Sequence, residues 1–459
     1  MKATKTLLRR IGVSRSLTRS LCALAALACA ASAQPPAASA PTEGSPITLE
    51  DALRRARQYA GQIQAANLAA LQAREDTAQV RAGRLPSVTA FNQYIYTEGN
   101  GTPSGTFVAN DGVHVYNEQA VVHEEVLSLV RRGEVNRALA AEAVARAKVD
   151  LASRGLTATV VQDYYAIVAA ERRAANAAAS LKQAQQFTSI TEKQEAGGEV
   201  AHADVVKARI EMGQRERDVR EAQLNIEKAK IALGVLIFPN FSSNFTVVDD
   251  LQPPALLPPA PEVQAQATAT SPELHAAAAG LEQAGHEVSV ARYQYLPSFG
   301  LDLFYGLDSN QFAARTYHSD LVLDNLPYRQ NLGYVAQATL NIPIWNWGAT
   351  RSKVKQAELK REQAAIDQTL AQRAVQSNIA AAYAEARGAL AELESLRNSV
   401  SLAGESLRLT LLRYQAGEAT ALEVVDAQNT ANLARNGEDG GLARYRIAVA
   451  NLQILTGSL

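Results

Sequence analysis

Histidines are the first side chains to examine for chemistry, because they ligate metals and transfer protons near neutral pH. His123 precedes two glutamates, but the second histidine of the zinc-protease motif is absent. His275 and His286 could share one face of a helix, yet no further ligand stands beside them in the sequence. The sequence therefore predicts no catalytic residue and no metal site.

Glycine and methionine patterns add no chemistry. Gly99, Gly101 and Gly105 lie in a polar loop and lack both the spacing and the following helix of a dinucleotide-binding fold. Met212 is the only methionine after the start, so a methionine-lined copper route is not expected. We expect a protein that is not an enzyme and has no cofactor.

Residues 1–33 have the character of a secretory signal peptide. A basic start precedes an apolar stretch that ends in Ala31-Ser32-Ala33, a cleavage pattern of small residues. Both cysteines, Cys22 and Cys29, lie inside this segment, so cleavage after Ala33 leaves no thiol. Lipidation of Cys29 is the alternative, although its preceding residues form a poor lipobox.

The mature chain is mildly acidic, which argues against nucleic acid as a partner. The whole chain has 45 basic and 46 acidic residues, and the signal peptide removes six basic residues and no acidic one. After the signal, no apolar run approaches the roughly 18 residues of a membrane-spanning helix.

Two blocks of sequence occur twice. The block Gly198–Ala208 resembles Gly417–Ala427 at an offset of 219, and Leu85-Pro86-Ser87 matches Leu296-Pro297-Ser298 at an offset of 211. The copies meet at a proline-rich linker. We expect a tandem duplication with a first repeat at 34–252, a linker at 253–262 and a second repeat at 263–459.

Each repeat has the same predicted order of elements: a helix, a β-hairpin and a long helical pair. A capping residue opens the first helix, which is expected from Thr48 to about Arg84, with its counterpart from about Pro272 to Tyr295. The hairpins and helical pairs are expected at 85–126 with 132–236, and at 296–345 with 349–456.

The predicted strands of the second hairpin alternate as membrane-spanning strands do. One face carries Phe299, Leu301, Leu303, Tyr305 and Leu307, the other carries Ser298, Gly300 and Asp302, and aromatic residues stand near both ends of the hairpin strands. The strands of the first hairpin alternate poorly, so a half-buried hairpin of a soluble protein remains the alternative.

The predicted helices are too long for a globular domain, since 65 residues of helix reach about 100 Å. Apolar residues step by three and four along the second repeat, as in coiled coils: Leu393, Leu396, Val400, Ala403 and Leu407.

In motif order and duplication, the whole mature chain resembles the TolC-type outer membrane efflux proteins. The shared motifs are the Leu-Glu-Asp-Ala-Leu start at Leu49, the repeated Leu-Pro-Ser, the Ile-Pro-Ile-Trp-Asn-Trp-Gly segment at 342–348, and Tyr414-Gln-Ala-Gly followed by Leu422-Glu-Val-Val-Asp-Ala. The resemblance implies a mainly α protein with membrane β-strands. It implies a homotrimer that forms one shared 12-stranded β-barrel, continued by a periplasmic α-helical barrel.

The resemblance also implies site residues and partners. The two helix-to-helix turns would contact a periplasmic membrane-fusion adaptor linked to an inner-membrane pump, although helix caps alone would also explain their residues. These turns comprise Gly198, Glu199, Val200, Ala201, Gly417, Glu418, Ala419 and Thr420.

Two acidic residues match the family's pore constriction. Glu423 and Asp426 share one helix face, and three copies would form a negative ring that favours cations. A solvated helix start, where acids are common, is the alternative. Asp204 and Tyr414 match partners in the family's closed gate, whereas Ala419 stands where some members carry an arginine.

The expected function is the exit duct of a tripartite efflux or type I secretion system, in the outer membrane of a Gram-negative-type bacterium. A stand-alone porin and a soluble periplasmic coiled-coil scaffold are the alternatives. The sequence does not select a cargo.

Overall fold

A computed structural model describes residues 46–96, 114–251, 257–309 and 332–459, which all fall in one structural unit. The predicted signal peptide, the alternative lipidation of Cys29 and residues 253–256 of the predicted linker lie outside the described residues. No helix within the described ranges is long and apolar enough to cross a membrane.

Helices and strands alternate in the same order in both repeats. The helices of the first repeat are α2 (Leu49–Tyr59), α3 (Gly61–Ala82), α4 (Leu129–Ala196) and α5 (His202–Ile237). Those of the second repeat are α6 (Ala260–Thr270), α7 (Pro272–Tyr293), α8 (Ala349–Gln415) and α9 (Ala421–Thr456). The strands are β1 (Ser87–Tyr96), β2 (His114–Leu127), β3 (Ser298–Ser309) and β4 (Leu332–Asn341).

Helices α6, α7 and α9 of the second repeat begin and end at the same offsets, 211 and 219 residues, that separate the repeated sequence blocks. The bounds of α2 and α3 recur in α6 and α7 at the offset of 211, and those of α5 recur in α9 at the offset of 219. A tyrosine contact repeats as well. The Tyr164 hydroxyl donates to the Ile47 carbonyl at 3.3 Å, and the Tyr383 hydroxyl donates to the Pro258 carbonyl at 3.1 Å.

Two sequence expectations are wrong in detail. The single helix expected from Thr48 to Arg84 is broken at Ala60, whose ψ of 121° is extended. The equivalent residue, Ser271, has a ψ of 118° because Pro272 excludes the helical conformation from the residue before it. Moreover, α6 begins at Ala260, inside the expected linker, since a proline is tolerated in the first turn of a helix.

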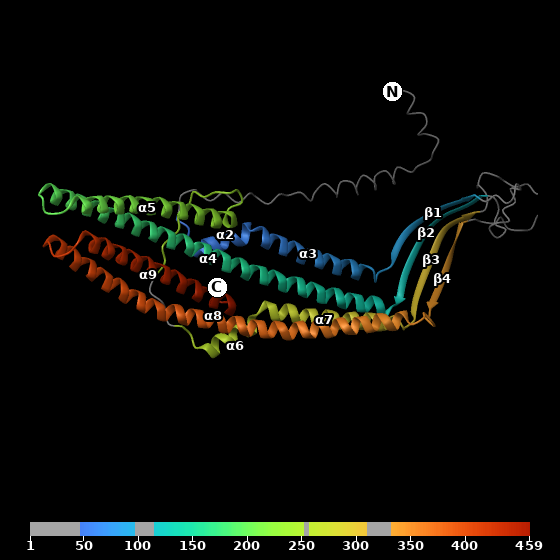
Figure 1. Ribbon diagram of the computed structural model, residues 1–459. Helices are drawn as coiled ribbons and strands as arrows, with labels where there is room; N and C mark the ends of the chain where they lie inside the picture. The colour runs from blue at the N-terminus through green and yellow to red at the C-terminus, as the bar shows by residue number, and fades with distance from the viewer. Residues whose placement is uncertain (1–45, 97–113, 252–256, 310–331) are drawn as a thin grey trace, which may run out of the picture. The chain divides into compact units, whose positions relative to one another are not determined.

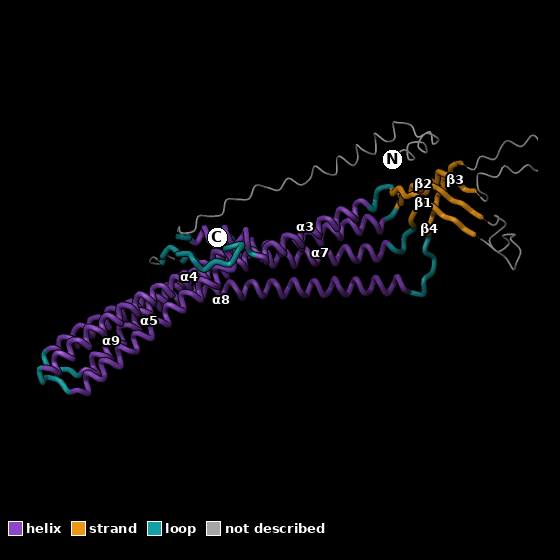
Figure 2. The backbone as a smooth tube through the Cα atoms, turned by 90° about the horizontal axis from the view of Figure 1, so that it is seen from above, coloured by secondary structure: helices purple, strands orange, loops and turns teal. Residues whose placement is uncertain are grey.

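The long helices form two antiparallel hairpins, α4–α5 and α8–α9. Helix α4 also packs against α3, α7 and α9. In Figures 1 and 2 both helix-to-helix turns lie at one end of the helical part, and the strands lie at the other. The predicted coiled-coil positions face inward, since Leu393, Ala403 and Leu407 are buried and Leu396 and Val400 are half-buried.

The largest core cluster lies where α2, α4, α5 and α9 meet the chain that follows α5. It includes Leu156, Val160, Tyr164, Ile167, Leu233, Ile237, Phe245 and Leu251. Toward the hairpin turns the helices bury mostly small residues, which allow helices to approach closely. The largest core cluster thus joins the two helical hairpins at the ends that lie away from their turns.

The four strands form one antiparallel sheet in the order β1-β2-β3-β4, with β1 and β4 at its open edges. The register aligns Ser87, His123, Asp302 and Gln337 in one row across the sheet. These four polar residues share one face, while Leu301, Leu303 and Tyr305 lie on the opposite face with Tyr334 and Leu340. The first hairpin follows this pattern only in part, because Glu118 and Glu124 lie on the apolar face and Phe91 and Val121 lie on the polar face.

Candidate functional site

The two helix-to-helix turns have the same backbone geometry. Gly198 and Gly417 have φ values of 79° and 77°, in the left-handed region that favours glycine. The Glu199 and Glu418 N–H groups then bond to carbonyls five residues earlier, at 2.8 Å each. This Schellman geometry ends α4 and α8 and reverses the chain. The glycines serve the turn conformation, because an added Cβ at either position would meet nothing within 4 Å.

The turns differ in how the next helix begins. Thr420 and Glu423 form a reciprocal capping box at the start of α9. Ala201, its counterpart before α5, has no side-chain cap. Of the predicted contact residues, Glu199, Ala201 and Glu418 are exposed, and Val200 and Ala419 are half-buried.

Tyr414 occupies a buried position between the two hairpins. It is 5% exposed, and its ring centroid lies 5.1 Å from that of Phe187 on α4. Its hydroxyl lies 3.2 Å from the Thr191 Oγ1, within a fully buried pair. The residues packed around it are Ala208, Ala421, Val424 and Val425. Tyr414 thus joins α8 to α4 close to the turns.

Asp204, the other predicted gate residue, lies in the first turn of α5 and is half-exposed. The structure gives Tyr414 a partner in Thr191, and no bond between Tyr414 and Asp204 occurs within the described residues of one chain. Sequence reasoning missed Thr191. Its hydroxyl also bonds to the Phe187 carbonyl one turn earlier, so its sequence context is that of an ordinary helical threonine.

Glu423 and Asp426 are both exposed on the first turns of α9. The Glu423 carboxylate accepts from the Thr420 N–H at 3.2 Å and lies 3.4 Å from the Arg413 guanidinium. Arg413 also donates to the Glu418 carbonyl at 3.1 Å. The Asp426 carbonyl accepts from the Thr430 hydroxyl at 2.8 Å.

Glu423 and Asp426 therefore differ in whether a nearby positive charge balances their carboxylate. Arg413 partly neutralises Glu423, whereas nothing of opposite charge pairs with Asp426 among the described residues. The sequence did not predict the ion pair between Arg413 and Glu423, because Arg413 reaches Glu423 across the turn, at a separation of ten residues. No periodic pattern marks such a pair.

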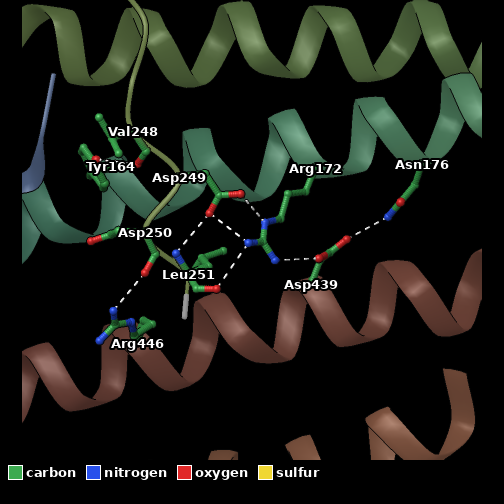
Figure 3. A network of polar contacts seen from close by, with 9 residues as sticks. All are labelled: Tyr164, Arg172, Asn176, Val248, Asp249, Asp250, Leu251, Asp439 and Arg446. Carbon is green, nitrogen blue, oxygen red and sulfur yellow. Dashed lines mark hydrogen bonds and ion pairs between the residues drawn. The ribbon is translucent and has the colours of Figure 1, made fainter. Parts of the chain in front are cut away.

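A second polar network lies farther from the turns, where the chain after α5 crosses α4 and α9 (Figure 3). Arg172 on α4 binds Asp249 with two hydrogen bonds of 2.6 and 2.9 Å, and reaches Asp439 on α9 at 3.1 Å. Asn176 donates to the same Asp439 at 2.8 Å. Three segments far apart in the sequence are thereby fixed to one guanidinium.

Burial and charge act in opposition on Asp249. Burial favours its neutral form, but the Arg172 hydrogen bonds, the Leu251 N–H and the Arg172 charge outweigh it and lower the pKa of the Asp249 carboxyl. Beside this network, burial and the Asp250 charge raise the pKa of Tyr165 to about 12. These groups are held in their ordinary charge states, which indicates a structural role.

No cluster of three or more histidine, cysteine, aspartate or glutamate side chains suited to a metal ion occurs in the described ranges. The site therefore consists of two shaped turns, a buried tyrosine contact and one exposed acidic helix face. Such an arrangement offers surfaces and charge rather than reactive groups.

Comparison with known proteins matches residues 263–458 to the family described as "Outer membrane efflux protein". The cobalt-zinc-cadmium resistance protein CzcC of Cupriavidus metallidurans is 24% identical over 66% of this chain and 68% of its own length. The pyoverdine export outer membrane protein OpmQ of Pseudomonas putida is 24% identical over 65% and 60%. The chain thus spans about two thirds or less of these relatives.

Solved structures share the fold. A membrane protein from Pseudomonas aeruginosa aligns with a TM-score of 0.77 at 19% identity, over 89% of this chain and 90% of its own. The Neisseria gonorrhoeae MtrE outer membrane channel, solved in its open state, aligns with a TM-score of 0.73 at 21% identity, over 89% and 88%. The predicted family resemblance, mainly helical fold with a few strands and outer-membrane location are confirmed. Because members of this family are passive conduits, the prediction that the chain is not an enzyme is confirmed as well.

Proposed function

Given that this chain is related to the outer membrane efflux proteins, directly so over residues 263–458, we propose that it is the exit duct of a tripartite efflux or type I secretion system. It is a passive conduit, opened when its periplasmic end contacts an adaptor and an inner-membrane pump. The observation that carries the proposal is the union of one four-stranded, two-faced sheet with helices of up to 68 residues.

The open sheet edges support a shared barrel. Unpaired backbone groups on β1 and β4 are costly in a bilayer, where no water is available to satisfy them. Four strands cannot close a barrel alone, so edge pairing between copies is required. Three copies give the proposed 12 strands, with the polar row at His123 and Asp302 toward the lumen and the apolar face toward lipid.

Side chains at the helical end of the sheet support an interfacial position. Trp345 and Trp347 are 74% and 90% exposed, and their rings meet edge to face at 5.8 Å. Amphipathic aromatic rings favour the boundary between lipid and water. The helices that follow would then extend into the periplasm, since 68 helical residues reach roughly 100 Å.

Exposed apolar residues along the helices support assembly into a helical barrel. In one chain they are uncovered, and neighbouring copies would bury them. They include Leu68, Leu71, Ile210, Leu224, Leu359, Ile366 and Leu370. The turns at Gly198–Ala201 and Gly417–Thr420 would then form the adaptor-contacting tips, with Glu423 and Asp426 at the constriction and Asp204 and Tyr414 at the gate.

A soluble scaffold is the competing function, but it leaves the apolar face of the sheet without a partner. Leu303, Tyr305 and Tyr334 on that face are 43%, 56% and 76% exposed. A stand-alone porin does not explain the long helices. The relatives carry names that refer to metal resistance and to pyoverdine export, so they do not select one cargo for this chain.

The mass of the protein extracted from membranes in mild detergent tests the proposal. We expect a trimer that requires detergent. Thr339→Pro removes a backbone N–H from the edge strand β4 and should reduce the trimer, whereas Thr339→Ala keeps that N–H and should leave the trimer intact. A monomer released without detergent would instead support the scaffold.

A further inference from the structure

Helix α9 contains three glycines within five residues: Gly437, Gly440 and Gly441. Glycine in a helix interior weakens the helix because it adds backbone freedom. At the offset of 219, the equivalent positions in α5 are Asp218, Glu221 and Ala222. The two hairpins have the same fold because of the duplication, but only the second hairpin has this glycine cluster.

Packing explains two of the three glycines. A Cβ at Gly441 would lie 2.6 Å from a methyl group of Leu396 on α8, and one at Gly437 would lie 3.2 Å from the other methyl. Leu396 therefore fits between them. A Cβ at Gly440 would meet only the Arg173 guanidinium, at an ordinary 3.5 Å. Space alone does not require glycine at 440.

The glycine cluster coincides with an anchor. Asp439, between the glycines, binds Arg172 and Asn176 of α4 (Figure 3). From Leu442 onward α9 is densely buried, through Leu442, Ala443, Tyr445, Ala448, Ala450, Leu452, Ile454 and Thr456. Between the turn and the anchor only Ala421, Val424, Val425 and Ala431 are buried.

Three polar links join the described residues of the turn-side half of the second hairpin to the first hairpin. They are the buried pair of Thr191 and Tyr414, the bond from Arg215 on α5 to Asn429 on α9, and the 3.0 Å bond from Asn176 on α4 to Asn436 on α9. Helix α8 has a glycine of its own in this half, Gly404, at which an added Cβ would meet nothing within 4 Å. Its counterpart in α4 is Gln185.

We propose that Gly440 is a hinge, about which residues 421–436 of α9, with the adjoining end of α8, move away from α4 and α5. Asp439 holds the hinge on α4, and the Thr191–Tyr414, Arg215–Asn429 and Asn176–Asn436 links hold the hairpin in the position seen here. The inference rests on the proposed duct, because such a motion would widen its turn-side end.

Spin-label distances between Glu199→Cys and Glu418→Cys test the hinge. Both residues are exposed at the two turns, and the chain's own cysteines are confined to Cys22 and Cys29 in the predicted signal peptide. Labelled chains are diluted into trimers of unlabelled chains, so that each measured distance lies within one chain. Thr191→Val with Asn429→Ala and Asn436→Ala removes all three polar links, keeps the bond from Asn176 to Asp439, and should add a population of longer distances.

Gly440→Ala in that background should then reduce the long-distance population roughly fivefold, because alanine stabilises the straight helix. Gly213→Ala is the matched control, since it makes the same change inside α5 and its nearest neighbour would be Arg217 at 3.9 Å. It should leave the distances unchanged. Equal effects of the two glycine-to-alanine changes, no effect of Gly440→Ala, or no long distances after all three links are removed would each overturn the hinge.

Failure of the hinge is distinguishable from failure of the duct. If the hinge is wrong, the detergent-extracted trimer still forms and only the distances disagree. If the duct is wrong, the mass measurement yields no trimer, whatever the distances show.

Discussion

At the scale of single residues, the structure adds contacts between different helices that the sequence did not predict. Sequence position suggests that Glu423 and Asp426 contribute equally to one negative ring. The structure places Arg413 3.4 Å from Glu423 and leaves Asp426 without an opposite charge among the described residues. One acid therefore serves the helix start, and the other keeps its charge free.

This difference predicts unequal effects on ion selectivity in bilayer recordings. Asp426→Asn should lower the cation-to-anion permeability ratio roughly twofold or more, because a free charge at a constriction dominates the local potential. Glu423→Gln should change it less, since glutamine retains the capping box and the lost charge was paired. Arg413→Met should raise cation selectivity by releasing Glu423.

Matching permeability ratios for Asp426→Asn and Glu423→Gln would contradict the prediction. Glu405→Gln on exposed α8 is a control, because Glu405 pairs with Arg408 at 2.8 Å away from the start of α9. It removes the same type of charge and should leave selectivity unchanged.

At the scale of elements, the structure depends on ties between segments that are distant in sequence. Arg172 joins α4 to Asp249 after α5 and to Asp439 on α9. Because the folded pKa of Asp249 is lowered, its stabilisation is present above the unfolded pKa of about 3.9 and is lost as the pH falls through the folded value.

Arg172→Met should therefore lower the melting temperature at neutral pH by roughly 2 to 6 °C, for a loss of about 1 to 2 kcal/mol in partly exposed hydrogen bonds. The difference from the unmodified protein should begin to shrink below about pH 4, the unfolded pKa, and should disappear as the pH falls through the lower folded pKa of Asp249. Thermal scans across that range measure both effects. Arg397→Met, which breaks an exposed 3.7 Å pair with Glu438, should change little. A constant difference at all pH values would contradict the role of Asp249.

Sequence patterns predict elements well where one residue type dictates the backbone. Glycine at 198 and 417 marks both turns, and alternation marks the strands of the second hairpin. The break at Ala60 has no such mark, because Gly61 stands where the second repeat has Pro272. Tertiary packing of α2 decides that position: Ala52, Leu53 and Ala56 are buried in the main core.

At the scale of the whole molecule, the internal duplication suggests how copies meet. The pair Ser87 and His123 in the first hairpin corresponds to Ser298 and Asn341 in the second. His123 in turn pairs with Asp302, whose counterpart at an offset of 211 is Phe91. If the junction between copies repeats the junction between β2 and β3, Asn341 of one copy lies opposite Phe91 of the next.

Cysteines at Asn341 and Phe91 should therefore give the main disulfide-linked product between copies on mild oxidation, seen as a dimer on a denaturing gel. Asn341→Cys with Asn92→Cys is the control, because successive strand residues point to opposite faces. A stronger cross-link at Asn92 than at Phe91 would contradict this register.

The duplication also bears on any partner that surrounds such a trimer. Each chain contributes two hairpins of the same fold but different surface: Thr420 caps one turn and Ala201 leaves the other uncapped, and only one hairpin has the glycine cluster. Around the ring of three chains, the hairpin backbone would occur six times, whereas each hairpin's own set of surface side chains would occur three times. A partner that recognises shape would find six sites, and one that recognises side chains would find three.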